Sequence, residues 1–327
     1  MTKRKVVVIG GGHGQSAILR GIKKIEDIDI AAIVTVADDG GSTGRLRRRF
    51  HIPAMGDIRN VLISLGESET LLSTLMDYRF ESADSEEEDV MGHNLGNLIL
   101  TAMTQSCGSF LESISTLCKV LNVRGEIIPA TSQVITLFAR MHDGTIVRGE
   151  SNIPDISNRI NEVFYEEEVK ATPAAIQAIL DADVVILGIG SVYTSILPNI
   201  IIPEIKEALE KSKAKVVYYC NAMTQPGETD GYTMEDHVAA FHHHGSDVDM
   251  VVMADEIIPE AILKRYHEEG SMEVLMSEEK HEYEVMKCPL LDFSKDLVRH
   301  DSEKIRKSLE VILERMNEDV LYYGGQK

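Results

Sequence analysis

Five short apolar runs, each closing on small or polar residues, constrain the fold of this 327-residue chain most strongly. They occupy residues 6–9, 30–36, 184–187, 216–219 and 250–253 and are rich in β-branched side chains. A strand that helices cover on both faces has such an uninterrupted apolar sequence, and it belongs to a parallel sheet. The pattern therefore predicts an α/β fold, a Rossmann-like, doubly wound and mainly parallel sheet.

The middle of the chain departs from this rhythm. Residues 57–119 have helical periodicity, and one apolar stripe there predicts a helix face in the core. The stripe consists of Leu95, Leu98, Ile99, Ala102 and Met103. Residues 125–170 are rich in strand formers, and Asp143-Gly144 suits a hairpin turn. We therefore predict a single domain over 1–327, with a helical and small β-rich insertion around 67–170 and a closing C-terminal helix.

Composition narrows the function classes. With 33 basic and 53 acidic residues the net charge is −20, which opposes binding to nucleic acid or an anionic membrane. The acidic run at 81–89 is predicted to be a solvated loop. No apolar run approaches the ~20 residues of a membrane span, and the first one is too short for a signal peptide. Four cysteines without metal spacing fit reduced thiols, so we expect a soluble, cytoplasmic protein.

The first apolar run ends on a glycine-rich turn, GGGHGQS, at residues 10–16. Such glycines let backbone N–H groups approach a pyrophosphate at a helix N-terminus. Gly12, Gly14 and Ala17 fit the dinucleotide spacing GxGxxA, whereas the register that starts at Gly10 fails at Gln15. Packing of helix on strand alone is the alternative. The candidate phosphate-binding residues are Gly11, Gly12, His13, Gly14, Gln15 and Ser16.

The second run ends on ADDGGSTGRLRRR at residues 37–49. An acid at the end of the second Rossmann strand binds a ribose, and a Gly/Ser/Thr loop with arginines suits phosphate. Asp38 or Asp39 could instead hold Mg²⁺ beside a diphosphate. A turn into a solvated basic helix is the alternative. The candidate residues are Asp38, Asp39, Gly40, Gly41, Ser42, Thr43, Gly44 and Arg45.

Further polar segments are expected at the same sheet edge or at nearby helix starts. Asp57 suits an N-cap, and the other segments offer amides, hydroxyls and an imidazole for hydrogen bonds to a ligand. These candidates are Asp57, Arg59, Asn60, His93, Asn94, Asn97, Gly190, Ser191, Tyr193, Thr194, Asn221 and Thr224. Before the terminal helix, Arg299 could reach a diphosphate. Ser302 is an expected N-cap and a candidate phosphorylation site, which would imply a regulatory kinase.

Taken together, seven motifs resemble the gluconeogenesis factor family (YvcK-type) of the CofD-like (2-phospho-L-lactate transferase-like) superfamily. The motifs are GGGHGQS, ADDGGSTGRLR, GDIRN, HNLGN, GIGSVYTSILPN, CNAMTQPGET and VRHD, and they extend from residue 6 to about 302. The resemblance implies a Rossmann-like fold that binds UDP-sugars such as UDP-N-acetylglucosamine or UDP-glucose. It also implies a role in cell shape and wall synthesis during growth on gluconeogenic carbon sources. The transferase branch lacks the long Gly-Ser-Thr-Gly-Arg run, which counts against phospholactate transfer.

Three functions stay open from the sequence. The first is a regulatory UDP-sugar-binding protein that requires no cofactor, because no nucleophile–base motif such as GxSxG occurs. The second is a Mg²⁺-dependent transferase acting on a diphosphonucleotide. The third is an NAD-dependent oxidoreductase, although Asp38 follows Gly10 by 28 residues (38 − 10) instead of about 20. NAD could still occupy the nucleotide site. The sequence assigns no catalytic residue and leaves the choice between monomer and homo-oligomer open.

Overall fold

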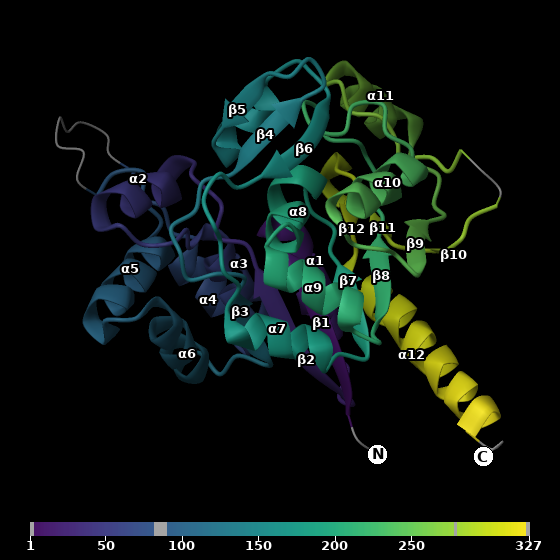
Figure 1. Ribbon diagram of the computed structural model, residues 1–327, viewed down its shortest axis with the longest axis horizontal. Helices are drawn as coiled ribbons and strands as arrows, with labels where there is room; N and C mark the ends of the chain where they lie inside the picture. The colour runs from purple at the N-terminus through teal and green to yellow at the C-terminus, as the bar shows by residue number, and fades with distance from the viewer. Residues whose placement is uncertain (1–2, 82–89, 278–279, 325–327) are drawn as a thin grey trace.

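A seven-stranded sheet forms the centre of the computed structural model, which describes residues 3–81, 90–277 and 280–324 (Figure 1). All neighbouring strands are parallel, in the order β10-β9-β8-β7-β1-β2-β3. The strands are β1 (Arg4–Gly10), β2 (Ile28–Val34), β3 (Glu126–Pro129), β7 (Val184–Leu187), β8 (Lys215–Tyr219), β9 (Met250–Ala254) and β10 (Glu284–Cys288). The α/β prediction and all five apolar strands are confirmed, and two edge strands, β3 and β10, complete the sheet.

The strand order reverses between β1 and β7. The chain builds β1, β2 and β3 outward in one direction, then returns to place β7 beside β1 and continues to β10. The register pairs Val6 with Val184 and Ile9 with Leu187, so both strands end at the same level. Right-handed crossovers that run in opposite directions place their helices on opposite faces, which leaves a crevice outside these two carboxyl ends. This is where an open sheet of this kind binds ligands.

Helices cover both faces of the sheet. In Figure 1, α7, α8 and α9 lie in front of it, whereas α1 packs against α3 and α12. The first six helices are α1 (Gly12–Ile22), α2 (Gly41–Phe50), α3 (Gly56–Leu65), α4 (Glu69–Met76), α5 (Leu95–Cys107) and α6 (Phe110–Val120). The others are α7 (Pro173–Leu180), α8 (Leu197–Ile200), α9 (Pro203–Lys211), α10 (Met234–His244), α11 (Glu260–Glu268) and α12 (Ser302–Gly324). Within the described residues, no helix is long and apolar enough to cross a membrane.

The range 67–170 contains two kinds of structure besides helices. β3 belongs to the main sheet, where it pairs with β2. A small antiparallel sheet follows, in the order β5-β4-β6, from β4 (Phe138–Met141), β5 (Ile146–Arg148) and β6 (Ile160–Phe164). Its first hairpin turns at the predicted dipeptide: Gly144 has φ +87°, and Asp143 accepts a hydrogen bond from the Thr145 amide at 2.9 Å. The acidic run predicted as a loop lies outside the described residues except for Glu81.

The predicted core stripe of α5 is only partly right. Ile99 and Met103 are half-buried and pack against the core, whereas Leu95 and Leu98 are half-buried and Ala102 is exposed. The buried side of the helix instead carries Gly96, Asn97, Leu100, Thr101 and Thr104. Polar side chains can be buried here because they are satisfied. The Thr101 and Thr104 hydroxyls each donate to the carbonyl four residues earlier at 2.8 Å. Asn97 bonds to α2 and α3, as described below.

Candidate ligand site at the carboxyl edge of the sheet

The glycine-rich turn after β1 starts α1 at the crevice between β1 and β7. Gly11 is the N-cap, and a Cβ at Gly14 would overlap the carbonyl oxygen of Ile189 in the loop after β7. Gly14 therefore lets the start of α1 lie directly on that loop. The first amides of a helix have no intrahelical partner, so this N-terminus can receive an anion at the strand-order reversal.

Two of the six candidates in this turn serve the fold. Gln15 is fully buried, and its amide donates at 2.9 Å to the carbonyls of Val8 and Ile33, which ties β1 to β2. Ser16 is also buried, and its hydroxyl donates to the Gly12 carbonyl at 3.1 Å. The GxGxxA pattern thus positions a helix, while the groups left for a ligand are the backbone amides and the exposed His13 ring.

Positive charge gathers around His13. Partial burial lowers the pKa of His13, and the next causes are the nearby guanidinium groups of Arg299 and Arg59. Arg59 belongs to α3, whereas Arg299 lies on β12 (Arg299–His300), at the far end of the chain. We call the α1 N-terminus with Arg59 and Arg299 the cationic pole. Helix amides and two guanidinium groups together suit a phosphate or diphosphate.

Several carboxylates lie beside the cationic pole. Asp38 accepts a bond from the Gly40 amide at 2.9 Å, and Asp39 accepts one from the Ser151 amide at 3.0 Å. Burial raises the pKa of Asp38, and burial together with Asp38 raises the pKa of Asp57 to about 7. Asp57 is not the predicted N-cap, because α3 begins at Gly56 with Met55 as its cap. Its carboxylate instead faces the α1 start, where a Cβ at Gly11 would lie 2.5 Å from it.

Two further carboxylates at this edge were missed from the sequence. Burial and the neighbouring charges of Asp38, Asp57 and Glu228 raise the pKa of Glu150 to about 8. Burial raises the pKa of Glu228, which accepts hydrogen bonds from the hydroxyls of Ser191 and Thr194. Glu228 stands within the motif CNAMTQPGET and could have been found there. No motif in the sequence indicated Glu150. It belongs to a 3₁₀ turn, Glu150–Asp155, next to the small sheet. Together with Asp38, Asp39 and Asp57 these residues form the acidic cluster.

The loops around α2, α3 and α5 form one hydrogen-bonded wall. Asn97 donates to the hydroxyls of Ser42 at 3.2 Å and Thr43 at 3.4 Å, and accepts from Arg59 at 3.1 Å. His93 Nδ1 lies 2.8 Å from the Ser42 hydroxyl. Arg59 also donates to Asn60 at 2.9 Å. These predicted residues do come together, with the glycines 40, 41 and 44 at the start of α2. Asn94 caps α5 and donates away from the wall, to the Asp77 carbonyl at 3.3 Å.

The arginine run does not form one anion site, contrary to the interpretation from sequence. Arg47 is buried and donates to the carbonyls of Ala37 and Ile135, so it supports the fold. Arg45 donates to the Met91 carbonyl at 2.7 Å, and Arg48 is exposed. Consecutive helical residues point about 100° apart, which sends the four side chains in different directions.

The loops after β7 and β8 close the other side of the crevice. Asn221 donates to the Gly190 carbonyl at 3.0 Å, so these two candidates touch. The hydroxyls of Tyr193 and Thr224 form hydrogen bonds within the protein. The Tyr193 hydroxyl lies 2.8 Å from that of Tyr232, and the Thr224 hydroxyl accepts the Met272 amide at 2.8 Å. Beside Asn221 a cavity of about 280 Å³ opens at the carboxyl ends of β8 and β9. Its lining is mostly apolar, with Ile257, Ile258, Val274 and Leu275 among its walls.

Ser302 is the first residue of α12 and not its N-cap. The cap is Asp301, whose carboxylate accepts the Lys304 amide at 2.8 Å. Ser302 instead donates its hydroxyl hydrogen to the Ala17 carbonyl on α1 at 2.8 Å. A phosphate at Ser302 would have to replace this α1–α12 contact.

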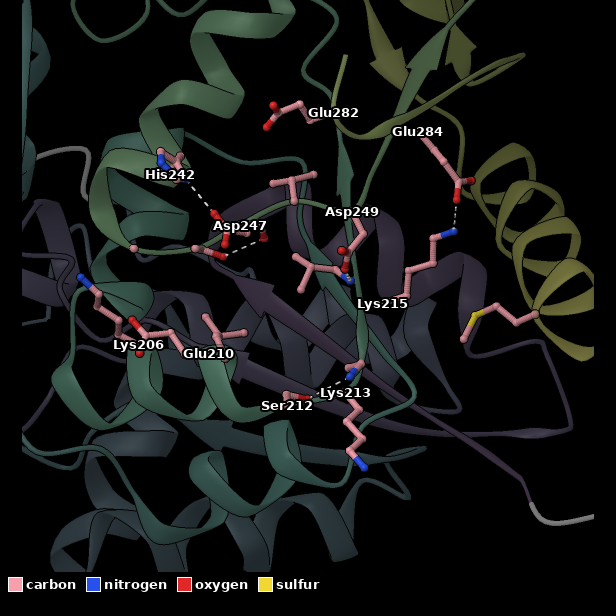
Figure 2. Close-up of a pocket in the computed structure, with 17 residues that line it drawn as sticks. Lys206, Glu210, Ser212, Lys213, Lys215, His242, Asp247, Asp249, Glu282 and Glu284 are labelled. Atoms are coloured by element: carbon pink, nitrogen blue, oxygen red, sulfur yellow. Dashed lines mark hydrogen bonds and ion pairs between the residues drawn. The ribbon is translucent and has the colours of Figure 1, made fainter. Parts of the chain in front are cut away.

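A wide groove of about 830 Å³ lies at the opposite, amino edge of the sheet (Figure 2). Several of its charged side chains are paired within the groove. Lys215 pairs with Glu284 at 2.8 Å, and His242 with Asp247 at 2.7 Å. Asp249 accepts the Val216 amide at 2.7 Å. None of the sequence candidates lines it, and open parallel sheets bind ligands at the carboxyl edge. The crevice is therefore the better candidate site.

Comparisons with known proteins agree with this architecture. The model of the family described as 2-phospho-L-lactate transferase CofD matches residues 6–291. The gluconeogenesis factor of Bacillus subtilis is 44% identical over 317 residues, covering 95% of this chain and 98% of that protein. The putative gluconeogenesis factor of Thermotoga maritima is 41% identical, and the match covers 94% of this chain and 99% of that protein. A crystal structure of a UPF0052 family protein from Bacillus halodurans superposes with a TM-score of 0.88 at 44% identity, covering 94% and 99%.

Proposed function

The chain belongs to the CofD family and, within it, to the gluconeogenesis factors, and from that premise we propose that it binds a UDP-sugar as a regulatory ligand. The ligand is UDP-N-acetylglucosamine or UDP-glucose, and its site is the crevice at the carboxyl edge. Occupancy of the site, which reports the supply of activated sugar, controls cell shape and wall synthesis during growth on gluconeogenic carbon sources.

The observation that carries this proposal is the cationic pole at the strand-order reversal. His13 stands at the α1 N-terminus, and partial burial together with the positive charges of Arg299 and Arg59 lowers its pKa, in a chain whose net charge is −20. A diphosphate suits such a site, because it is anionic and offers oxygens to helix amides and guanidinium groups alike.

The rest of the ligand has room on both sides of the pole. The apolar cavity beside Asn221 suits an uncharged ring. The amides and hydroxyls of the wall on α2 and α5 can exchange their mutual hydrogen bonds for bonds to sugar or ribose hydroxyls. A nucleoside diphosphate sugar combines these three chemistries in one molecule.

The test is calorimetric titration with UDP-N-acetylglucosamine, UDP-glucose, GDP and NAD, each with and without Mg²⁺. We expect a UDP-sugar to bind most tightly. Arg299→Ala should weaken it at least about tenfold, since a charged hydrogen bond contributes about 1.5–3 kcal/mol. Arg315→Ala, an exposed arginine on α12, is the matched control and should leave the affinity unchanged. Tighter binding of NAD or GDP, or equal effects of the two variants, would refute the proposal.

A second candidate is a Mg²⁺-dependent transferase that acts on a diphosphonucleotide, and the acidic cluster favours it. Carboxylates with raised pKa values repel one another when ionised, and a divalent cation relieves that repulsion. Asp38 or Asp39 would hold a Mg²⁺ ion that also binds phosphate oxygens, while no group of three or more His, Cys, Asp or Glu side chains in the described residues is arranged to hold a metal. Turnover of a nucleoside diphosphate donor with Mg²⁺, abolished by Asp38→Asn, would favour this reaction over a purely regulatory role.

A further inference from the structure

The loop after β7 continues into a π-helical turn, Val192–Ile196, which runs directly into α8. The Ile196 amide donates at 3.1 Å to the Ser191 carbonyl, five residues back, so the turn is one residue wider than a turn of α-helix. Single wide turns of this kind are frequent at functional sites. Because this one follows the carboxyl end of β7, beside the strand-order reversal, its side chains are candidates for contact with a ligand.

Four hydroxyls stand in and beside this turn, and three of them are bonded within the protein. Ser191 and Thr194 donate to the carboxylate of Glu228, and the Tyr193 hydroxyl pairs with that of another tyrosine. The fourth belongs to Ser195, which is half-buried. In the part of the chain that the structure describes, its hydroxyl makes no hydrogen bond. Ser195 therefore has a donor that is free for a ligand.

The backbone around Ser195 is firmly held. Its amide donates to the Ser191 carbonyl at 3.0 Å, and its carbonyl accepts the side-chain amide of Asn199 at 2.9 Å. Asn199 is fully buried and also donates at 3.2 Å to the carbonyl of Gly10, the last residue of β1. Asn199 thus ties the turn to β1. A donor on such a rigid backbone needs little ordering when a ligand binds.

The Ser195 hydroxyl lies beside the first residue of α1. A Cβ placed at Gly12 would lie 3.9 Å from Ser195 Oγ and 3.9 Å from Asp57 Oδ1. Outside α1 and its N-cap, no other atom of the described residues comes within 4 Å of this point. The hydroxyl and the carboxylate therefore flank the amides that start α1, with Ser195 on the β7 side and Asp57 on the α3 side.

Charge decides which of these two groups suits a phosphate. The α1 amides favour an anion, which an ionised carboxylate repels, whereas a hydroxyl can donate to it. We propose that Ser195 is a binding residue for the diphosphate of the ligand: its hydroxyl donates to an oxygen of the phosphate group at the α1 N-terminus. The phosphate then lies on the β7 side of the crevice, away from Asp57. This inference rests on the proposed function, because it assigns a contact within that site.

The test is calorimetric titration of the intact chain with UDP-N-acetylglucosamine and with inorganic pyrophosphate, at one fixed Mg²⁺ concentration. Wild type is compared with Ser195→Ala and with Ser115→Ala, the matched control at an exposed serine on α6. We expect Ser195→Ala to weaken the binding of both probes about tenfold or more, since a hydrogen bond to a charged group is lost. The control should leave both affinities unchanged. Without ligand all three chains should melt at the same temperature, because the Ser195 hydroxyl has no partner to lose within the described residues.

Ser195→Asp separates a phosphate contact from a contact to the sugar. A carboxylate repels a phosphate but can accept a hydrogen bond from a sugar hydroxyl. Ser195→Asp should therefore weaken pyrophosphate binding at least about tenfold more than Ser195→Ala does. The inference is overturned if Ser195→Ala binds both probes as tightly as wild type, if it loses affinity for the UDP-sugar alone, or if Ser195→Asp equals Ser195→Ala.

The two probes keep this inference apart from the proposed function. A wild type that binds pyrophosphate in a Ser195-dependent way, but binds no UDP-sugar, would refute the proposed function and support the assignment of Ser195. A wild type that binds the UDP-sugar, with both affinities indifferent to Ser195→Ala, would refute this inference and leave the proposed function standing. Binding of neither probe would refute both.

Discussion

Replacing Asp57 by asparagine should stabilise the ligand-free protein, and the gain should grow as the pH rises from about 4 to 7. Burial and the nearby Asp38 raise the pKa of Asp57 from 3.8 to about 7. Between these two values the folded chain holds a proton that the unfolded chain has released. The free energy of unfolding therefore falls as the pH rises from about 4 to 7, and it stays at the lower level above pH 7.

The magnitude follows from the size of the shift. About three pKa units at 1.36 kcal/mol each set an upper limit of about 4 kcal/mol for the cost of ionised Asp57. About 3 kcal/mol of this falls between pH 5 and pH 8. Asparagine has nearly the same shape and keeps an oxygen that can accept the Gly12 amide, but it does not ionise. The variant should thus gain up to about 3 kcal/mol on wild type between these two pH values.

Urea unfolding at pH 5 and pH 8, with a chelator and without ligand, measures the effect. Asp27→Asn, at an exposed carboxylate, is the control and should show no such gain. A difference between Asp57→Asn and wild type that is the same at both pH values would refute the reasoning. So would a variant that is less stable than wild type at pH 8.

Three further predictions concern the neighbourhood of the site. Gly14→Ala should destabilise the protein by about 4 kcal/mol or more in urea unfolding, because its Cβ would collide with backbone that cannot move aside. Arg47→Ala should cost about 2–4 kcal/mol in the same assay, since it leaves buried carbonyls without a donor, while the exposed Arg48→Ala should stay within about 0.5 kcal/mol. Equal costs for the two arginines would contradict the structural role of Arg47. Ser302→Asp should lower the unfolding free energy by about 1 kcal/mol, because aspartate cannot donate to α1 as the hydroxyl does, and an unchanged melting temperature would argue against that contact.

The buried strands could be predicted because their signal is local. A strand covered on both faces must be apolar at every position. Residues 6–9 and 184–187 meet this requirement, so they can be recognised as buried strands without reference to the rest of the chain. β10 escaped prediction because an edge strand has no such requirement. Its residues Glu284 to Cys288 are half-buried or exposed, with Glu284 and Lys287 among them.

Which side of α5 is buried could not be predicted. The stripe shows that one side of the helix is more apolar than the other, but not which side the rest of the protein covers. The hydrogen-bond partners of Asn97 decide the matter, and they come from α2 and α3. The arginine run failed for a related reason. The sequence has four arginines in five residues, but the helix points their side chains in different directions. The guanidinium group of Arg47 binds backbone carbonyls of the fold.

The sequence by itself determined the parallel sheet and the edge at which a ligand would bind, because strand ends carry their glycines and polar residues with them. Tertiary structure decided which charges meet there. Besides burial, the charge of Arg299, from the far end of the chain, lowers the pKa of His13, and the charges of Asp38 and Asp57 raise the pKa of Glu150. Electrostatic energy depends on distance in space, and no spacing along the chain reports it. The apolar stripe of α5 was likewise plain in the sequence, but only the folded chain showed that the polar Asn97, Thr101 and Thr104 are buried on its other side.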